Sequence, residues 1–120
     1  MHIKGSCHCG AVHFTVNSDP QFLVECNCSV CRRYGTLWAH SRRSPNIEIH
    51  HNNQTSQYIW GDKEIAFHFC KACGCLTHWQ SLTDSECAVN MRMCEPAERA
   101  QFPIRKFDGA DSWKFLAEVT

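Results

Sequence analysis

The sequence has no excess of charge of either sign and no long hydrophobic run. Its 120 residues include 12 basic and 12 acidic side chains, so the formal net charge is zero. Balanced charge disfavours a function that depends on bulk attraction to nucleic acid or to an anionic membrane. No window approaches the roughly 18 apolar residues that a membrane span requires. We therefore expect no nucleic-acid partner and no membrane partner.

A secretory leader is also missing from the sequence as given. The chain opens with MHIKGSC (residues 1–7), which is polar and already contains a cysteine. A signal peptide has a charged start, an apolar run of roughly 7–15 residues and a small-residue cleavage site. We expect a cytoplasmic protein whose thiols are kept reduced. The alternative is a disulfide-rich secreted domain whose leader has been removed.

Short alternating segments dominate the chain. With 43% hydrophobic residues the sequence is too apolar for a disordered tail, and its length predicts one domain over residues 1–120. Period-two alternation, typical of half-buried strands, occurs at 12–16, 47–49, 58–60, 65–69 and 89–93. Turn residues separate these segments at 17–20, 44–46, 52–53 and 61–62. The pattern predicts a mainly β fold of antiparallel hairpins, with helix limited to 29–34 and to 95–100, where Pro96 suits a first helical turn.

Ten cysteines are the most unusual feature of so short a chain. Seven of them lie in three tight clusters at CHC (7–9), CNCSVC (26–31) and CKAC (70–73). Spacings of two and three residues present several sulfurs from one turn, as metal sites require, and they favour metal over disulfides. Zinc prefers four ligands in a tetrahedron, with sulfur at about 2.3 Å.

The first and last clusters together supply a complete ligand set. Cys7, Cys9, Cys70 and Cys73 would fill the coordination sphere of one zinc ion, with about sixty residues between the two halves. A closed four-thiolate site leaves no position for substrate and supplies folding free energy instead. We predict a structural zinc site here.

The middle cluster has one ligand fewer. Cys26, Cys28 and Cys31 supply three sulfurs, and three protein ligands with an open position are the pattern of a catalytic zinc. The alternative is that Cys75, Cys87, Cys94 or a histidine closes the site. An anionic substrate would need a local cation, which Arg32 or Arg33 could supply, although arginines in such a position are often solvated surface charges.

Four segments carry a resemblance to a known family: GSCHCGAV (5–12), CNCSVCRR (26–33), FCKACG (69–74) and IRKFDGADSW (104–113). Together they resemble the glutathione-dependent formaldehyde-activating enzyme family, which also contains centromere protein V. The resemblance implies a tent-like fold of packed antiparallel sheets. It also implies two Zn²⁺ ions, one structural on the four cysteines and one catalytic on the three. The sequence departs from the family at Cys75, where a hydroxyl residue is common.

The resemblance implies a carbon–sulfur lyase type of activity, the joining of formaldehyde to glutathione. The expected partner is a small-molecule thiol such as glutathione, with its carboxylates on Arg32 or Arg33. One alternative is a zinc-stabilised binding module without turnover. Another is a redox or zinc sensor that uses the surplus cysteines. The histidines are expected mostly at solvent-facing positions, and the four tryptophans either in the core or along a substrate cleft.

Overall fold

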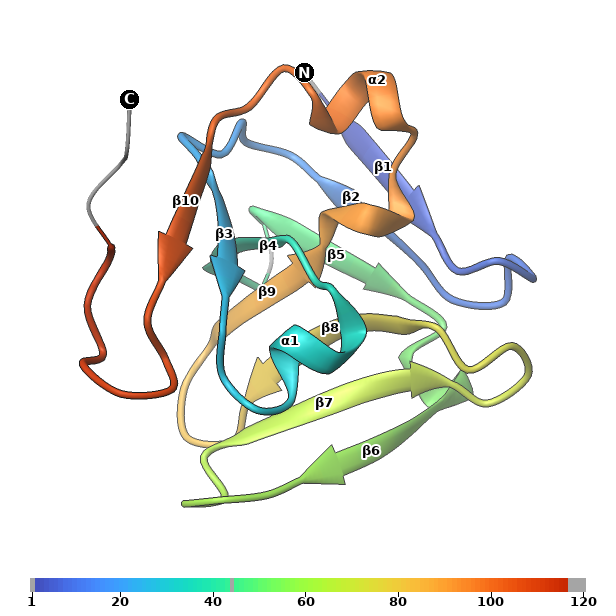
Figure 1. Cartoon of the computed structure of the whole chain (residues 1–120). Coiled ribbons are helices and arrows are strands. Elements are labelled where there is room, and N and C mark those ends of the chain that lie inside the picture. Colours follow the sequence, from blue (N-terminus) through green and yellow to red (C-terminus); the bar gives the residue numbers. More distant parts are fainter. Residues whose placement is uncertain (1, 44, 117–120) are drawn as a thin grey trace.

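The computed structural model describes residues 2–43 and 45–116. Within these residues, ten strands form two sheets, and helix is confined to four short segments (Figure 1). These are α1 (Cys31–Tyr34), α2 (Pro96–Arg99) and the 3-10 turns η1 (Asn52–Gln54) and η2 (Met91–Met93). None of the helices in the described part of the chain is long and apolar enough to cross a membrane. The predicted mainly β fold with minimal helix is confirmed.

The smaller sheet has three antiparallel strands in the order β1, β2, β5, with bounds Ile3–Ser6, His13–Val16 and Ile47–His50. β1 approaches β2 closely, because Gly5 lies opposite Phe14 and the Phe14 ring covers it. A β-carbon at Gly5 would collide with that ring, so this position requires glycine.

The larger sheet has seven strands in the order β10, β3, β4, β9, β8, β7, β6. Their bounds are Ile104–Phe107, Leu23–Cys26, Trp38–Arg42, Glu86–Asn90, Leu76–Ser81, Ile65–Cys70 and Thr55–Ile59. All neighbouring pairs are antiparallel except β10 and β3, which run parallel. This pair places β10 beside β3, the strand that ends at Cys26 of the middle cysteine cluster (left side of Figure 1).

The two faces of the larger sheet belong to two different apolar clusters. Residues from β3, β4 and β9 pack on one side against the small sheet in a fully buried core, which includes Leu23, Ala39, Cys87 and Val89. Their neighbours along the same strands, such as Val24, Trp38 and Ala88, belong to a second apolar cluster on the other face. Alternation along each strand therefore divides the side chains between a core and a cavity wall.

Most predicted elements are found, with two corrections. Strands occur within the segments predicted at 12–16, 47–49, 58–60 and 65–69, and both predicted helices are present. The prediction of a strand over 89–93 was wrong in its second half. The backbone leaves β9 at Asn90 and turns into η2, because the Asn90 side chain accepts a hydrogen bond from the Arg92 amide. The parallel β10–β3 pair was not foreseen, and Ser44 of the predicted turn at 44–46 lies outside the described residues.

Candidate metal centres

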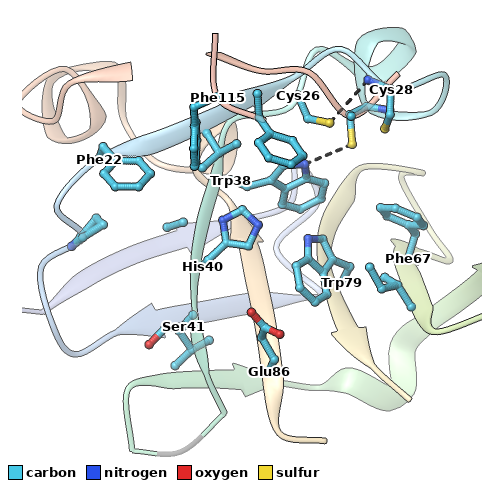
Figure 2. A pocket seen from close by; sticks show the side chains of 18 of the residues that line it. Phe22, Cys26, Cys28, Trp38, His40, Ser41, Phe67, Trp79, Glu86 and Phe115 are labelled. Atoms are coloured by element: carbon cyan, nitrogen blue, oxygen red, sulfur yellow. Dashed lines mark hydrogen bonds between the residues drawn. The ribbon is translucent and has the colours of Figure 1, made fainter. Parts of the chain in front are cut away.

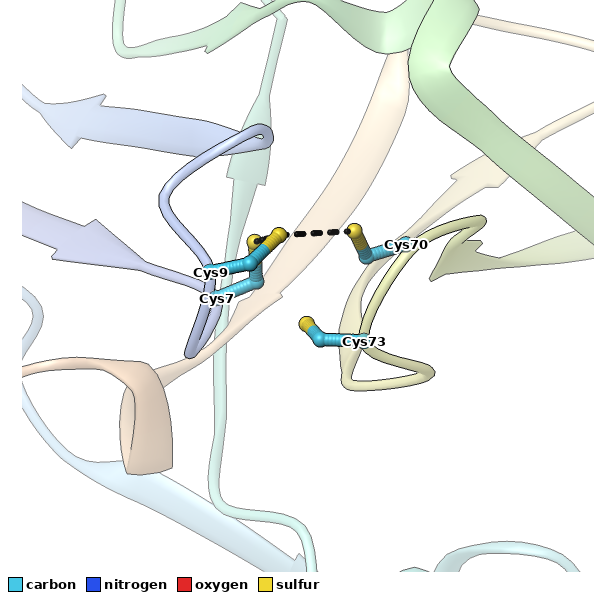
Figure 3. A group of neighbouring side chains, drawn as sticks. All are labelled: Cys7, Cys9, Cys70 and Cys73. Atoms are coloured by element: carbon cyan, nitrogen blue, oxygen red, sulfur yellow. Dashed lines mark hydrogen bonds between the residues drawn. The ribbon is translucent and has the colours of Figure 1, made fainter.

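The four-cysteine group is assembled from two distant turns. Cys7 and Cys9 follow β1, whereas Cys70 ends β7 and Cys73 lies in the turn before β8 (Figure 3). The four sulfurs all lie within 4.8 Å of one another. The Sγ atoms of Cys7 and Cys9 are 3.7 Å apart, and those of Cys9 and Cys70 are 3.6 Å apart. A tetrahedron with Zn–S bonds of about 2.3 Å has edges of about 3.8 Å, so the spacing fits zinc.

Backbone amides in both turns point at these sulfurs. The Val12 amide donates to Cys7 Sγ at 3.3 Å. The amides of Cys75 and Cys9 lower the pKa of Cys73 to about 5, and the Cys73 amide lowers the pKa of Cys70. Gly10 and Gly74, with φ of 84° and 79°, give each turn the left-handed residue that it needs. The backbone is therefore arranged for thiolates, as a metal site requires.

Four thiols at this distance cannot all ionise without a cation nearby. The Ala11 amide lowers the pKa of Cys9, but the neighbouring Cys70 thiol, loss of hydration and the Cys7 and Cys73 thiols raise it to about 11 overall. A divalent ion removes this repulsion, and soft sulfur donors select zinc among the common divalent ions of the cell. The residues present fit a closed, four-sulfur zinc site.

The three-cysteine group lies at the junction of β3 and α1. Cys26 ends β3, Cys28 lies in the connecting turn and Cys31 begins α1. Their sulfurs lie within 4.8 Å of one another. Within 2–43 and 45–116, no fourth histidine, cysteine, aspartate or glutamate joins this group. Three hydrogen bonds to sulfur hold it: the Cys28 amide to Cys26, the Cys31 amide to Cys28, and Trp38 Nε1 to Cys31 at 3.3 Å (Figure 2).

Ionisation of one of the three thiols opposes ionisation of the others. The pKa of Cys28 lies far below that of an ordinary thiol, because the Cys26 and Cys31 thiols both donate to its sulfur. Hydrogen bonds with the Cys26 and Cys28 sulfurs, together with loss of hydration, raise the pKa of Cys31. A bound cation would allow all three to ionise together, so this soft donor set also fits zinc.

The C-terminal loop closes over this group. Asn27, between two of the cysteines, donates to Asp108 Oδ1 at 3.0 Å and accepts from the Ala110 amide at 3.0 Å. Asp108 is held in turn by the Ser112 hydroxyl and amide. Gly109 lies between these contacts, directly against the Cys26 sulfur. Residues 108–112 therefore fix the turn that carries the cysteines.

A cavity of about 960 Å³ opens beside the three cysteines (Figure 2). Cys26, Cys28 and Cys31 line one end of it, and all four tryptophans of the chain line its walls. The walls come mainly from one face of the large sheet and from the C-terminal loop. The four-cysteine group contributes no residue to this lining. Of the two sulfur clusters in the described residues, the three-cysteine group therefore lines this cavity and the four-cysteine group does not.

The family model of glutathione-dependent formaldehyde-activating enzymes matches residues 2–105, a stretch that contains all seven clustered cysteines. The chain belongs to this family.

Two other proteins are similar to this chain. A protein of Halomonas elongata that carries the family name is 53% identical over 34 residues, which are 28% of this chain and 22% of the relative. The chain thus matches only about a fifth of that relative's length. A crystal structure of a Rhodobacter sphaeroides protein superposes with a TM-score of 0.68 at 29% identity, covering 85% of this chain and 99% of the other.

The surplus cysteines of this family member lie away from the open group. Cys87 is completely buried in the core between the sheets, and Cys94 packs there with its thiol toward the Met91 sulfur at 3.8 Å. Cys75 is half-buried beside the four-cysteine turn and belongs to neither metal group. Burial raises the pKa of Cys87 to about 11 and that of Cys94 to about 12. Such thiols are poor redox sensors, so the structure does not favour the sensor alternative.

Arg32 and Arg33 are exposed on α1 and do not line the cavity. Arg33 donates to the Ser29 carbonyl at 2.6 Å. Their contact with a glutathione carboxylate stays a prediction, and any such contact would lie outside the cavity.

Two histidines are buried, although the histidines were expected mostly at solvent-facing positions. His68 and His78 are 2% and 0% exposed, and their rings stack with centroids 4.4 Å apart. β7 lies between β6 and β8 and is buried on both faces, so alternation does not identify an exposed side. Thr55 and Thr77 contact their Nδ1 atoms, and Asn52 contacts Nε2 of His78.

The sequence analysis assigned no chemistry to Gly109 and missed the roles of Asn27 and Trp38. Gly109 sits in the segment that carried the family resemblance, but its Asp-Gly pair was interpreted only as a turn. The N–H of Trp38 has no sequence signal that distinguishes it from a core tryptophan.

Proposed function

We propose that this chain is a zinc-dependent enzyme of the carbon–sulfur lyase type. It acts on adducts between a low-molecular-weight thiol, such as glutathione, and a small carbonyl compound, such as formaldehyde. The three-cysteine zinc is the reaction site and the four-cysteine zinc is structural.

One contrast supports this proposal. Both sulfur groups are preorganised for a metal ion, but only the three-cysteine group has no fourth ligand among the described residues and lines a cavity. An ion bound by three cysteines keeps one position for a substrate, whereas four cysteines fill it. The family name adds the expectation that the substrate is a thiol and its formaldehyde adduct.

The reaction requires few groups. In the forward direction the thiol sulfur attacks the carbonyl carbon, a C–S bond forms, and the electron pair of the C=O bond moves to oxygen, which takes up the thiol proton. The reverse direction breaks the C–S bond and returns that proton to sulfur. A zinc ion at the three cysteines would lower the pKa of the thiol and polarise the carbonyl oxygen.

The protein's own residues keep the cysteines in place for this reaction. Trp38 donates its N–H to Cys31, and two backbone amides donate to Cys26 and Cys28. These bonds reduce the charge on each sulfur and fix its direction, which is the usual task of groups behind a metal ligand. Arg32 and Arg33 would meet the glutathione carboxylates on the exposed side of α1.

Exchange NMR tests the proposal. Glutathione and formaldehyde interconvert with their adduct without a catalyst, so the measured quantity is the exchange rate above this background. We expect zinc-loaded protein to accelerate the exchange and Cys28→Ser to abolish the acceleration. Cys75→Ser is the matched control, because Cys75 belongs to neither metal group. Exchange at the spontaneous rate with fully zinc-loaded protein would reject the enzyme and leave the binding-module alternative.

A further inference from the structure

The cavity beside the three cysteines is far larger than formaldehyde requires. Its volume of about 960 Å³ is near the upper end of the roughly 300–1,000 Å³ that is usual for sites of drug-sized ligands. A molecule with one carbon and one oxygen would leave nearly all of it filled with water. The volume of the cavity therefore points to a substrate that is larger than formaldehyde.

The walls of the cavity are apolar and aromatic. Trp38 and Phe67 pack against each other with ring centroids 6.2 Å apart, and Trp79 lies near them on β8. From β10 and the C-terminal loop, the Phe107 ring meets those of Trp113 and Phe115 edge to face at 5.2 Å and 5.1 Å. Aromatic faces and edges of this kind are suited to a flat hydrophobic group.

The charges around the cavity have one sign. Four carboxylate residues line it, at positions Asp19, Asp62, Glu64 and Glu86, and no lysine or arginine is among the lining residues that the structure describes. Arg105 lies behind the wall, with its guanidinium 4.0 Å from the centre of the Phe115 ring and 4.9 Å from that of Phe22.

His40 is the basic side chain of the lining. Its ring meets Trp79 edge to face at 5.5 Å, and the surrounding wall lowers its pKa by removing water. Its ring nitrogens can form hydrogen bonds, and the lowered pKa disfavours the charged form of the ring. An anion in this cavity would meet four carboxylates and no lysine or arginine, whereas an uncharged molecule would not lose the hydration of a charge.

We propose that the cavity binds the apolar body of an uncharged aldehyde, aromatic or branched, and excludes anionic compounds. As a statement about substrate, this rests on the proposed function. The aldehyde carbon faces the three cysteines, and the hydrophobic body packs between the tryptophans of the sheet and the aromatic residues of the C-terminal loop. The charged thiol glutathione then approaches from the exposed side of α1, where Arg32 and Arg33 lie.

Two fluorescent probes with the same aromatic body test the binding without any catalysis. N-Phenyl-1-naphthylamine is uncharged, and 8-anilinonaphthalene-1-sulfonate adds one negative charge. Because all four tryptophans line the cavity, energy transfer from tryptophan reports each probe there. We expect the uncharged probe to bind zinc-loaded protein at least about tenfold more tightly, a difference of about 1.4 kcal/mol. Benzaldehyde should displace it and glutathione should not.

Substitutions that remove carboxylate charges test whether these charges cause the selectivity for the uncharged probe. The double substitution of Asp62→Asn with Glu86→Gln should strengthen binding of the sulfonate and leave the uncharged probe unchanged, since both carboxylates are exposed at the rim. Glu95→Gln, next to α2 and outside the cavity, is the matched control and should change neither. Equal or tighter binding of the sulfonate to the unsubstituted protein would overturn the inference, as would displacement by glutathione but not by benzaldehyde.

The inference and the proposed function fail separately. If the uncharged probe binds selectively but the exchange of glutathione with formaldehyde stays at its spontaneous rate, the inference that the cavity binds uncharged molecules is supported and the lyase proposal is rejected. If exchange is accelerated but neither probe binds, the lyase proposal stands and the inference about the aldehyde falls. If both hold, acceleration relative to the spontaneous rate should be larger for benzaldehyde than for formaldehyde.

Discussion

Gly109 packs against Cys26 so tightly that a β-carbon at position 109 would lie 2.6 Å from the Cys26 sulfur. The same carbon would be 3.3 Å from Cys28 Cβ and 3.5 Å from the Trp113 ring. No side chain fits there without displacing the Cys26 sulfur. A loop 83 positions away in the sequence thus sets the space around the three-cysteine group, because β10 pairs with β3.

Gly109→Ala should weaken metal binding at the three-cysteine group alone. Moving a tightly packed neighbour costs about 1–3 kcal/mol, which corresponds to a loss of about tenfold to a hundredfold in affinity. Competition with a chromogenic chelator measures the two sites separately. Asp111→Ala, an exposed change in the same loop, is the control and should leave both affinities intact. Normal affinity at the three-cysteine group in the Gly109→Ala protein would contradict the packing argument.

Removal of the two metal ions should have different consequences. Cys70→Ser breaks the group that joins the β1 turn to the β7–β8 turn, and structural zinc sites contribute about 10–16 kcal/mol against a typical net stability of about 5–15 kcal/mol. We expect this variant to unfold. Cys28→Ser should keep the fold and bind one ion fewer. Circular dichroism together with metal content decides, and unfolding of both variants would contradict the division into structural and catalytic sites.

The Trp38 N–H should contribute to metal affinity independently of packing. Trp38→Phe keeps most of the apolar contact in the 2% exposed site but removes the donor to Cys31 at 3.3 Å. Loss of a hydrogen bond to a metal ligand usually costs about tenfold to a hundredfold in affinity. Trp79→Phe is the matched control, since Trp79 lines the same cavity but makes no hydrogen bond to a sulfur among the described residues. Equal affinities in the two variants would show that only packing matters.

The two cysteine groups could be predicted because their signal is local. Spacings of two and three residues bring cysteine sulfurs together in a single turn wherever the turn lies in the fold. Pairing the Cys7 turn with the Cys70 turn then followed from the four ligands that zinc prefers. The strands were predictable where one face is buried and the other is only half-buried, as in β2.

The rest depends on contacts between distant segments. Gly109 gains its importance from the parallel pairing of β10 with β3, and no turn signal in the sequence reports that pairing. Met91 and Met93 continue the period-two pattern of β9, but the Asn90 side chain caps a 3-10 turn and ends the strand. The cavity has no sequence pattern at all, because its lining comes from eight strands and several loops.

The stacked histidines His68 and His78 should make stability depend on pH below neutrality. Loss of hydration lowers the pKa of His68 to about 4 and that of His78 to about 3, from 6.5. Both are therefore neutral in the folded protein at pH 7. As pH falls below 6.5, the unfolded chain takes up protons that the folded chain does not, so the free energy of unfolding decreases toward acid. Above that pH the contribution is fully present and constant.

Each histidine contributes a slope of up to about 1.4 kcal/mol per pH unit between its unfolded and folded pKa values. Denaturant unfolding from about pH 8 to about pH 5.5 should show this decline. Acid also protonates cysteine ligands, so the informative quantity is the difference between variants with the same metal sites. His78→Gln should flatten the decline because one buried titrating group is gone, whereas His2→Gln, at an exposed position, should leave it unchanged. The same slope in all three proteins would mean that the thiolates alone cause the acid sensitivity, and that the buried pair takes no part in it.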